Sequence, residues 1–437
     1  MLLAALAPAL PGAGRAGPSA GSPLPKADAV FARFDPAEVA VGRLLFYDPV
    51  LSGSRTVSCA TCHHPKMATA DGVSLGLGDG ASGLGPARRA DPENLPEIRI
   101  PRHAPALFNL GASEFTVFFH DGRLEADPER PNGIRTPLGE DMLGGFASAL
   151  SAQSMFPVLS ADEMAGHYSE NDVSRAVRLG RLTGEGGAWD IISKRVAALP
   201  EYRKRFDAVI GPEAQITFPV ISNALAAFIA DEWRADQSPF DRYLRTGAPL
   251  ADEAMAGMDL FYGKAQCSTC HAGQFQTDHG FHAIAMPQIG PGKSARFETH
   301  ARDTGRMRVT GDRADAYAFR TPSLRNVALT APYGHSGAYA DLRGVIMHHL
   351  DPVAALKSYD ISQAMLPDLP EADDTWALDR PSEIAAIAAA NTLQPMTLSR
   401  TEIDQLIAFL HALTDDSSLR AGSGVPETVP SGLKVDQ

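Results

Sequence analysis

Cys59-Ala-Thr-Cys62-His63 and Cys267-Ser-Thr-Cys270-His271 together contain all four cysteines of this 437-residue chain. Each segment is a Cys-x-x-Cys pair followed at once by histidine, which is the signature of c-type haem attachment. Two thiols one helical turn apart can add to the two vinyl groups on one edge of a haem, and the imidazole of the next residue can reach the iron. The sequence therefore predicts two covalently bound haem c groups, with His63 and His271 as axial ligands of the iron atoms.

Three other uses of the cysteines fit less well. A zinc site built from two Cys-x-x-Cys pairs has about 15–20 residues between the pairs, whereas about 200 residues separate them here. A thioredoxin-like redox site needs one pair in a βαβ unit and no histidine. A disulfide within each pair would close a very short loop and add little stability.

The composition bounds the class of protein. The 39 Lys and Arg against 52 Asp and Glu give a formal net charge of −13, which argues against binding to nucleic acid or to an anionic membrane surface. A hydrophobic content of 44% is typical of a globular chain. The 39 glycines and 33 prolines indicate many turns and connecting loops. The length allows two or three domains.

The start of the chain resembles an export signal. Residues 2–10 form a short apolar run, and small residues, proline and glycine follow to about residue 25, as in the cleavage region of a signal peptide. The run is too short to span a bilayer, and no later stretch approaches the ~18 apolar residues that a span needs. Because bacteria attach haem c outside the cytoplasmic membrane, we expect an exported, periplasmic protein without a membrane span, and residues 1–25 as its leader.

Helical patterns recur along the chain. Ser399 and Glu402 form a capping box, and apolar residues at helical spacing follow it, which predicts a helix over 399–414. Further helices are predicted at 218–233 and 197–206, and a linker at about 236–250. No window shows sustained strand alternation. The predicted fold is mainly α with long irregular loops.

Four further segments resemble the bacterial dihaem cytochrome c peroxidase family, which includes the MauG-type enzymes. They are residues 42–52 (GRLLFYDPVLS), 118–123 (FFHDGR), 238–243 (SPFDRY) and 320–335 (RTPSLRNVALTAPYGH). The resemblance implies two cytochrome-c-like haem domains: an N-terminal peroxidatic domain over 26–236 and a C-terminal electron-transfer domain over 250–415. It allows the 399–414 helix to pack back on the N-terminal domain, and it leaves residues 416–437 as a polar tail.

The same resemblance assigns catalytic residues. The segment 153–164 matches the distal segment of the family in spacing. Glu163 would lie over the open face of the first iron and shuttle protons while the O–O bond of peroxide breaks. Gln153 and Pro157 would shape the pocket, as in the MauG-type branch.

The iron ligands depart from the family pattern. The family places the sixth ligand of the second haem fourteen residues after the histidine of its Pro-Tyr-x-His segment. Counted from His335, this position is His349. A slip in register would make Met347 or His348 the ligand instead. Many family members also carry a distal histidine soon after the first motif. Residues 65–102 contain no histidine, so we expect an open first site, with His103 as a poor candidate for the missing ligand.

Two further assignments rest on the resemblance. His120 stands where the family has a tryptophan between the two haems, and histidine is the harder of the two to oxidise. Asn109, together with the backbone carbonyls of Thr330 and Pro332, matches the ligands of a calcium ion at the domain interface. Oxygen ligands suit Ca²⁺.

These features predict an oxidoreductase of the cytochrome c peroxidase class. In the first interpretation it reduces H₂O₂ to water with electrons from a small cytochrome c or cupredoxin, relayed from the C-terminal to the N-terminal haem. In the second it is a MauG-type enzyme that uses H₂O₂ to oxidise a side chain of a partner protein through a high-valent dihaem state. A carrier with two saturated haems is a third interpretation, although it would not need an acid such as Glu163. A homodimer is compatible with each.

Overall fold

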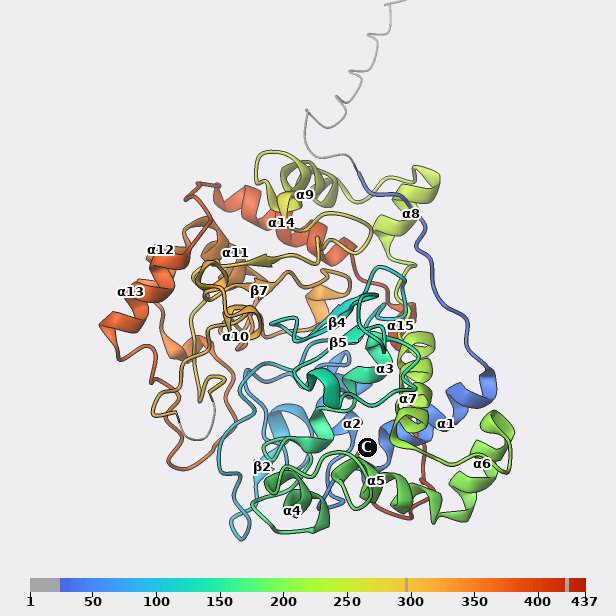
Figure 1. The fold of residues 1–437 in the computed structure, drawn as a ribbon. Helices are drawn as coiled ribbons and strands as arrows, with labels where there is room; N and C mark the ends of the chain where they lie inside the picture. The colour runs from blue at the N-terminus through green and yellow to red at the C-terminus, as the bar shows by residue number, and fades with distance from the viewer. Residues whose placement is uncertain (1–23, 295–297, 421–423) are drawn as a thin grey trace, which may run out of the picture.

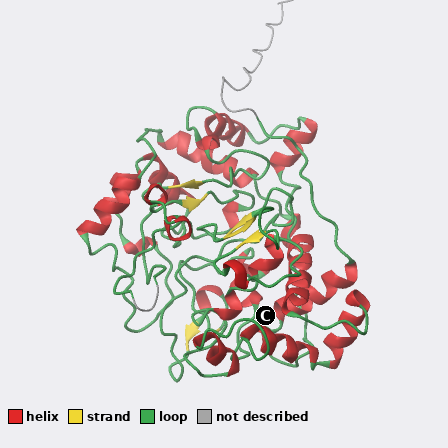
Figure 2. Cartoon of the chain, in the orientation of Figure 1, coloured by secondary structure: helices red, strands yellow, loops and turns green. Residues whose placement is uncertain are grey.

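The computed structural model describes residues 24–294, 298–420 and 424–437. The leader expected at 1–25 therefore lies almost wholly outside the described residues. Helices joined by long loops make up most of the chain (Figure 2). The helices are α1 (Pro36–Tyr47), α2 (Cys59–Cys62), α3 (Ala149–Gln153), α4 (Asp172–Arg178), α5 (Ala188–Ala197), α6 (Pro200–Ile210), α7 (Phe218–Glu232), α8 (Pro239–Thr246), α9 (Asp252–Tyr262), α10 (Met307–Thr310), α11 (Leu342–Leu350), α12 (Pro352–Lys357), α13 (Pro381–Ala390), α14 (Arg400–Ala412) and α15 (Ser417–Arg420). In the described ranges, no helix is long and apolar enough to cross a membrane.

The strands of the described residues are two or three residues long. They are β1 (Ala81–Ser82), β2 (Arg89–Ala90), β3 (Val117–Phe118), β4 (Leu124–Ala126), β5 (Ile134–Arg135), β6 (Phe281–His282) and β7 (Phe319–Arg320). They pair antiparallel as β1-β2, β3-β4-β5 and β6-β7, within single loops or between neighbouring ones. The prediction of a mainly α chain with long loops is confirmed.

The first hydrophobic core is built on the crossing of α1 and α7. A Cβ atom on Gly42 would lie 1.8 Å from the carbonyl oxygen of Ala224, so only glycine allows this approach of the two helices. One turn further along α1, Phe46 packs on Phe228 with ring centres 5.3 Å apart. This core also contains the first haem motif, residues 59–63, through the packing of Cys59.

The second core repeats this arrangement with α9 and α14. A Cβ atom on Gly257 would lie 1.9 Å from the carbonyl oxygen of Gln405, and Phe261 packs on Phe409 with ring centres 5.1 Å apart. The second haem motif, residues 267–271, joins this core through Cys267. The two helix pairs lie in different parts of the molecule (Figure 1).

A short sequence repeat accounts for the repeated packing. Residues 42–47 and 257–262 both read Gly-x-x-x-Phe-Tyr, on α1 and α9, and each precedes a haem motif. The glycine admits the partner helix, and the aromatic residues one turn later fill the space beside it. This repeat is a sequence signal for both helix pairs, in addition to the motifs described above.

The structure corrects three expectations about helices. The helix expected at 399–414 forms as α14 with its Ser399 capping box, but it packs on α9 in the second core and does not return to the N-terminal part. The helix expected at 197–206 is divided between α5 and α6, because Pro200 can begin a helix but cannot continue one. The linker expected at 236–250 contains α8, which Ser238 and Asp241 cap.

The residues after α14 also differ from the expected polar tail. Val429 and Val435 are buried in the first core, and the side chain of Ser431 donates a 2.6 Å hydrogen bond to Asp48. The C-terminus lies beside α2 (Figure 1). Near the end of the chain, the side chain of Asp436 accepts a 2.7 Å hydrogen bond from Thr61, which lies within the first haem motif.

Candidate functional site

The first haem motif lies on α2. Thr61 accepts a 3.0 Å hydrogen bond from the backbone of Ser58 and so caps the start of this short helix. His63 follows its last residue, and its Nδ1 lies 2.9 Å from the carbonyl oxygen of Thr69. Burial lowers the pKa of His63. A neutral imidazole with Nδ1 bound to a backbone carbonyl has Nε2 left as a metal ligand.

The second haem motif has the same arrangement. Cys267 begins a single 3₁₀ turn, Cys267–Thr269, in the loop that follows α9. Nδ1 of His271 lies 3.0 Å from the carbonyl oxygen of Gln276. Burial, together with the neighbouring His349, lowers the pKa of His271 to about 4. Both motifs therefore hold their histidine neutral and aim Nε2 away from the backbone.

The four thiols fit attachment to haem better than the other uses. All four are free, and burial raises the pKa of Cys59, Cys62 and Cys267 to about 12. Redox-active cysteines have a lowered pKa, so these thiols lack the property that a thioredoxin-like site needs. The two motifs also belong to different cores, which excludes one zinc ion bound by all four.

His349 lies opposite His271. It is on α11, its ring centre is 6.5 Å from that of His271, and the two planes are inclined by 55°. Two imidazoles on opposite sides of one metal ion, each bonded at about 2 Å, have ring centres about 6 Å apart. Nδ1 of His349 lies 2.8 Å from the carbonyl oxygen of Val345, which again leaves Nε2 as the ligand atom. The second site therefore fits a haem with two histidine ligands.

The two neighbours of His349 do not have a free ligand atom facing the site. His348 is buried, with Nδ1 2.9 Å from the Tyr339 hydroxyl and Nε2 2.8 Å from the carbonyl oxygen of Ile284. Met347 is 55% exposed. Both nitrogens of His348 are thus engaged, and Met347 points to solvent.

A cavity of about 350 Å³ lies beside the segment that carries Glu163. Its polar lining residues are Arg123, Ser160, Asp162, Glu163 and Lys293. The negative charge of Glu163 contributes to the raised pKa of Cys62, after burial and Asp71, so this carboxylate acts on the first haem motif. We call this space the distal cavity. It places an acid–base group beside the first motif. His103 also lies near His63, whose charge contributes, after burial, to the lowered pKa of His103.

Gln153 and Pro157 do not line the distal cavity. Gln153 ends α3, and its carbonyl oxygen accepts a 3.3 Å hydrogen bond from Phe156. Pro157 begins the 3₁₀ turn Pro157–Leu159, which leads to Ser160 and Glu163. These two residues shape the chain that carries Glu163.

His120 lies in a cluster of buried polar groups between the two halves. Burial, with the positive charge of Arg102 next, holds its pKa well below the usual value. Its backbone carbonyl accepts a 2.8 Å hydrogen bond from Arg320. Nearby, His335 stacks on Phe319 with ring centres 3.7 Å apart. The segment that carries the expected bridging residue is therefore fixed from both halves of the chain.

The expected calcium ligands have local roles. The Asn109 side chain exchanges two hydrogen bonds with the backbone of Ala235, at 2.8 and 2.9 Å. A carbonyl oxygen has two lone pairs, so Oδ1 of Asn109 keeps one for another partner. Thr330 donates a 3.3 Å hydrogen bond to Val327 through its side chain, and its backbone carbonyl is not part of that bond.

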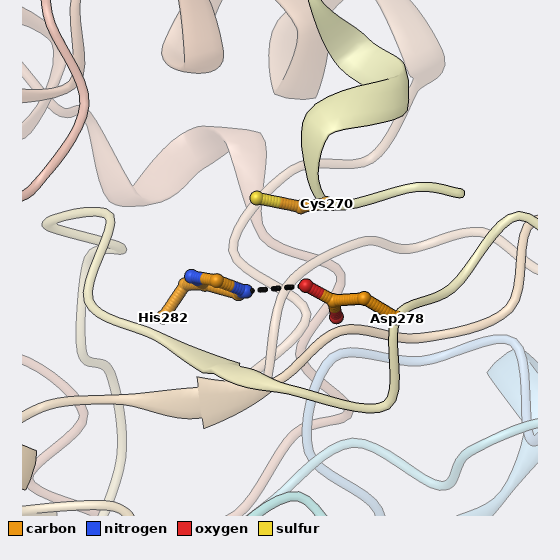
Figure 3. Close-up of side chains that lie close together, drawn as sticks. All are labelled: Cys270, Asp278 and His282. Atoms are coloured by element: carbon orange, nitrogen blue, oxygen red, sulfur yellow. Dashed lines mark hydrogen bonds and ion pairs between the residues drawn. The ribbon is translucent and has the colours of Figure 1, made fainter. Parts of the chain in front are cut away.

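One other group of potential metal ligands stands out in the described part of the chain. Cys270, Asp278 and His282 converge there, with Asp278 and His282 2.8 Å apart (Figure 3). The thiol of Cys270 belongs to the second haem motif. We therefore interpret the Asp278–His282 pair as part of the surroundings of the second haem.

Comparison with known proteins agrees with this geometry. Residues 36–248 match the di-haem cytochrome c peroxidase family. The MauG methylamine utilization protein of Methylorubrum extorquens is 30% identical over 332 residues, which are 75% of this chain and 71% of that protein. The cytochrome c551 peroxidase of Nitrosomonas europaea is 28% identical over 307 residues, 70% of each. The chain belongs to the dihaem cytochrome c peroxidase and MauG family of oxidoreductases.

Solved structures show the same fold. A MauG-like protein associated with microbial copper homeostasis is 26% identical, with a TM-score of 0.55 over 92% of this chain and 95% of that chain. The diheme peroxidase BthA of Burkholderia thailandensis is 21% identical, with a TM-score of 0.56 over 97% and 98%. The second likeness concerns the fold alone.

Three charged residues of the distal cavity are not among the predicted site residues: Arg123, Asp162 and Lys293. Asp162 directly precedes Glu163 in the sequence. Arg123 ends the 118–123 segment that carries the family resemblance, so a signal for it was present in the sequence. Lys293 comes from the other half of the chain, after the breaker sequence Gly290-Pro-Gly292. No pattern in the sequence connects it with Glu163.

Proposed function

We propose that this protein is a dihaem c-type peroxidase that reduces H₂O₂ to water. The proposal rests on one contrast between the haem motifs. His271 faces a second imidazole, that of His349, whereas the first motif adjoins a cavity lined by Glu163. A site with two protein ligands suits electron transfer, and a site with an open face suits reaction with a small substrate.

The proposed haem attachment follows the two motifs. Thioether bonds would join one haem to Cys59 and Cys62 and the other to Cys267 and Cys270, within cytochrome-c-like domains at 26–236 and 250–415. The repeated helix pairs α1–α7 and α9–α14 support this division. When bound, the haem iron supplies the redox chemistry.

The side chains of the distal cavity then handle protons. Reduction of H₂O₂ to two waters consumes two electrons and two protons. The Glu163 carboxylate would accept a proton from one peroxide oxygen and return it to the other, which becomes water. The turn that begins at Pro157 orients this carboxylate, and His120 lies in the region that electrons cross between the haems.

Location and further partners complete the proposal. Electrons would come from a small cytochrome c or cupredoxin in the periplasm, and a calcium ion bound by Asn109, Thr330 and Pro332 would brace the interface. The second lone pair of the Asn109 Oδ1 supports this ion.

A MauG-type reaction is the second candidate, in which H₂O₂ oxidises a side chain of a partner protein. The observation that favours it is the lack of a histidine in the stretch where many family members carry the displaceable ligand. Residues 65–102 contain none. A site that is open at rest would react without prior reduction.

One experiment separates the two functions. H₂O₂ is added to the fully oxidised protein, with and without reduced cytochrome c, and the haem spectrum is followed. Rapid oxidation of cytochrome c supports the peroxidase. A long-lived oxidised spectrum with slow turnover of cytochrome c supports oxidation of a partner. A spectrum that H₂O₂ does not change would contradict both.

A further inference from the structure

The distal cavity contains a cation that the reaction described above does not use. Lys293 lines this cavity with Glu163 and Arg123, although it comes from the loop between β6 and α10 in the other half of the chain. Within the described residues, its ammonium group makes no hydrogen bond or ion pair. Lys293 is partly buried, and a partly buried charge without a close ion pair is unfavourable, which indicates that Lys293 is placed to meet a ligand.

The loop holds Lys293 in place by close backbone packing. Gly290 and Gly292 both have positive φ angles, of 73° and 60°. A Cβ atom on Gly290 would lie 2.1 Å from a methyl group of Leu75, and one on Gly292 would lie 2.0 Å from the carbonyl oxygen of Ala301. Only glycine fits at either position. The loop therefore rests directly on the segment that follows the first haem motif.

Ion pairs tie the same loop to the N-terminal half. The side-chain oxygen of Gln288 accepts a 3.2 Å hydrogen bond from the backbone of Asp303. The Asp303 carboxylate in turn holds Arg102 by two hydrogen bonds, of 2.7 and 2.8 Å. Lys293 is thus positioned relative to Glu163 by rigid contacts across the two halves.

The other cation of the cavity is already neutralised. Arg123 pairs with Asp121 at 3.1 Å and stacks over the Phe119 ring at 3.7 Å. Lys293 makes no such pair at hydrogen-bond distance. Burial, followed by the charge of Arg123, lowers its pKa, and the negative charge of Glu163 offsets this only in part. A bound anion would oppose both effects, because it would bring a negative charge next to the ammonium group.

We propose that Lys293 binds and orients small anionic ligands in the distal cavity, hydroperoxide among them. This rests on the proposed function, since it adds a residue to the same peroxide site. The proton that leaves H₂O₂ goes to the Glu163 carboxylate, and the negative charge left on the hydroperoxide oxygen faces the Lys293 ammonium. No electron moves in this step. A fixed cation at that point favours the anion without reorganisation of solvent.

Fluoride is a suitable probe, because it is a small anion that takes no part in redox chemistry. We would titrate the fully oxidised protein with fluoride and follow the haem spectrum for the wild type, Lys293→Met, Lys293→Arg and the control Lys194→Met. Lys194 is on α5 with its side chain 63% exposed. Carbon monoxide binding to the reduced protein is the second measurement, because this ligand is neutral and reports whether the cavity is intact.

We expect Lys293→Met to weaken fluoride binding about tenfold, which corresponds to about 1.4 kcal/mol. Lys293→Arg and Lys194→Met should bind fluoride with nearly the wild-type affinity. Carbon monoxide binding should be unchanged in all variants. Equal fluoride affinity in Lys293→Met and the wild type would overturn this inference but not the proposed function. Equal losses of fluoride and carbon monoxide binding would also overturn it, since the role of Lys293 would then be structural. A wild type that binds neither ligand would overturn the proposed function as well.

Discussion

The imidazole of His349 faces that of His271 with ring centres 6.5 Å apart, although 77 residues lie between the two histidines in the sequence. The contact joins α11 to the loop that follows α9. Each ring has its Nδ1 near a backbone carbonyl, of Val345 and of Gln276. Of the three adjacent residues 347–349, His349 is the one whose imidazole faces His271.

The first prediction concerns this sixth ligand. Replacing His349 by Ala should convert the second haem from low spin to high spin, because one strong-field imidazole is lost. Electron paramagnetic resonance and the visible spectrum would detect the change. Met347→Ala is the matched control on the same helix, since Met347 is exposed. An unchanged low-spin signal in His349→Ala would show that another residue is the ligand.

The second prediction concerns Glu163. The variant Glu163→Gln should keep both haems but react with H₂O₂ about 10²–10⁴ times more slowly, because the amide cannot accept and return a proton. Stopped-flow spectroscopy with excess peroxide would measure the rate. Glu201→Gln provides the control, since that carboxylate is on α6 with 47% of its side chain exposed. A rate near the wild-type value in Glu163→Gln would rule out the proton-shuttle role.

The third prediction concerns the helix pair of the second core. Gly257→Ala should destabilise the protein by about 1–3 kcal/mol, because its methyl group would collide with the carbonyl oxygen of Gln405. Thermal unfolding followed by circular dichroism would measure this. Gly144→Ala is the control, since its nearest neighbour, on Asn132, would lie 3.6 Å away. Equal melting temperatures of the two variants would contradict the close helix crossing.

The fourth prediction concerns pH and the buried Arg102–Asp303 pair. Burial by itself would raise the pKa of Asp303, but the Arg102 guanidinium outweighs it and lowers the pKa to about 2. The unfolded value is about 3.9, so ionised Asp303 stabilises the native state by about 2 kcal/mol above that pH. This contribution should disappear as the pH falls from about 4 towards 2.

The comparison of wild type with Asp303→Asn tests this dependence. Their difference in free energy of unfolding should be constant between pH 5 and pH 7 and should shrink in more acidic solution. A difference that does not change down to about pH 2 would mean that the carboxylate of Asp303 is not stabilised by Arg102 in the native state.

Local features of this protein could be predicted from the sequence alone. The haem motifs depend on contacts within one helical turn, and the Ser399–Glu402 capping box and the apolar face of α7 depend on residues three or four positions apart. Such patterns do not require knowledge of the rest of the chain. The helix boundary at Pro200 is also a local feature, although apolar residues on both sides of it favour one continuous helix.

Only the tertiary structure decided which distant residues meet. The sequence count left His349, His348 and Met347 as alternatives, and the packing of α11 turns one imidazole towards His271 while it engages or exposes the other two side chains. Lys293 reaches Glu163 because a glycine loop fits against Leu75, and Asp436 reaches Thr61 because the chain end packs on the first core. These contacts join segments that are far apart in the sequence, so they follow from the close packing of the whole chain and not from any local pattern.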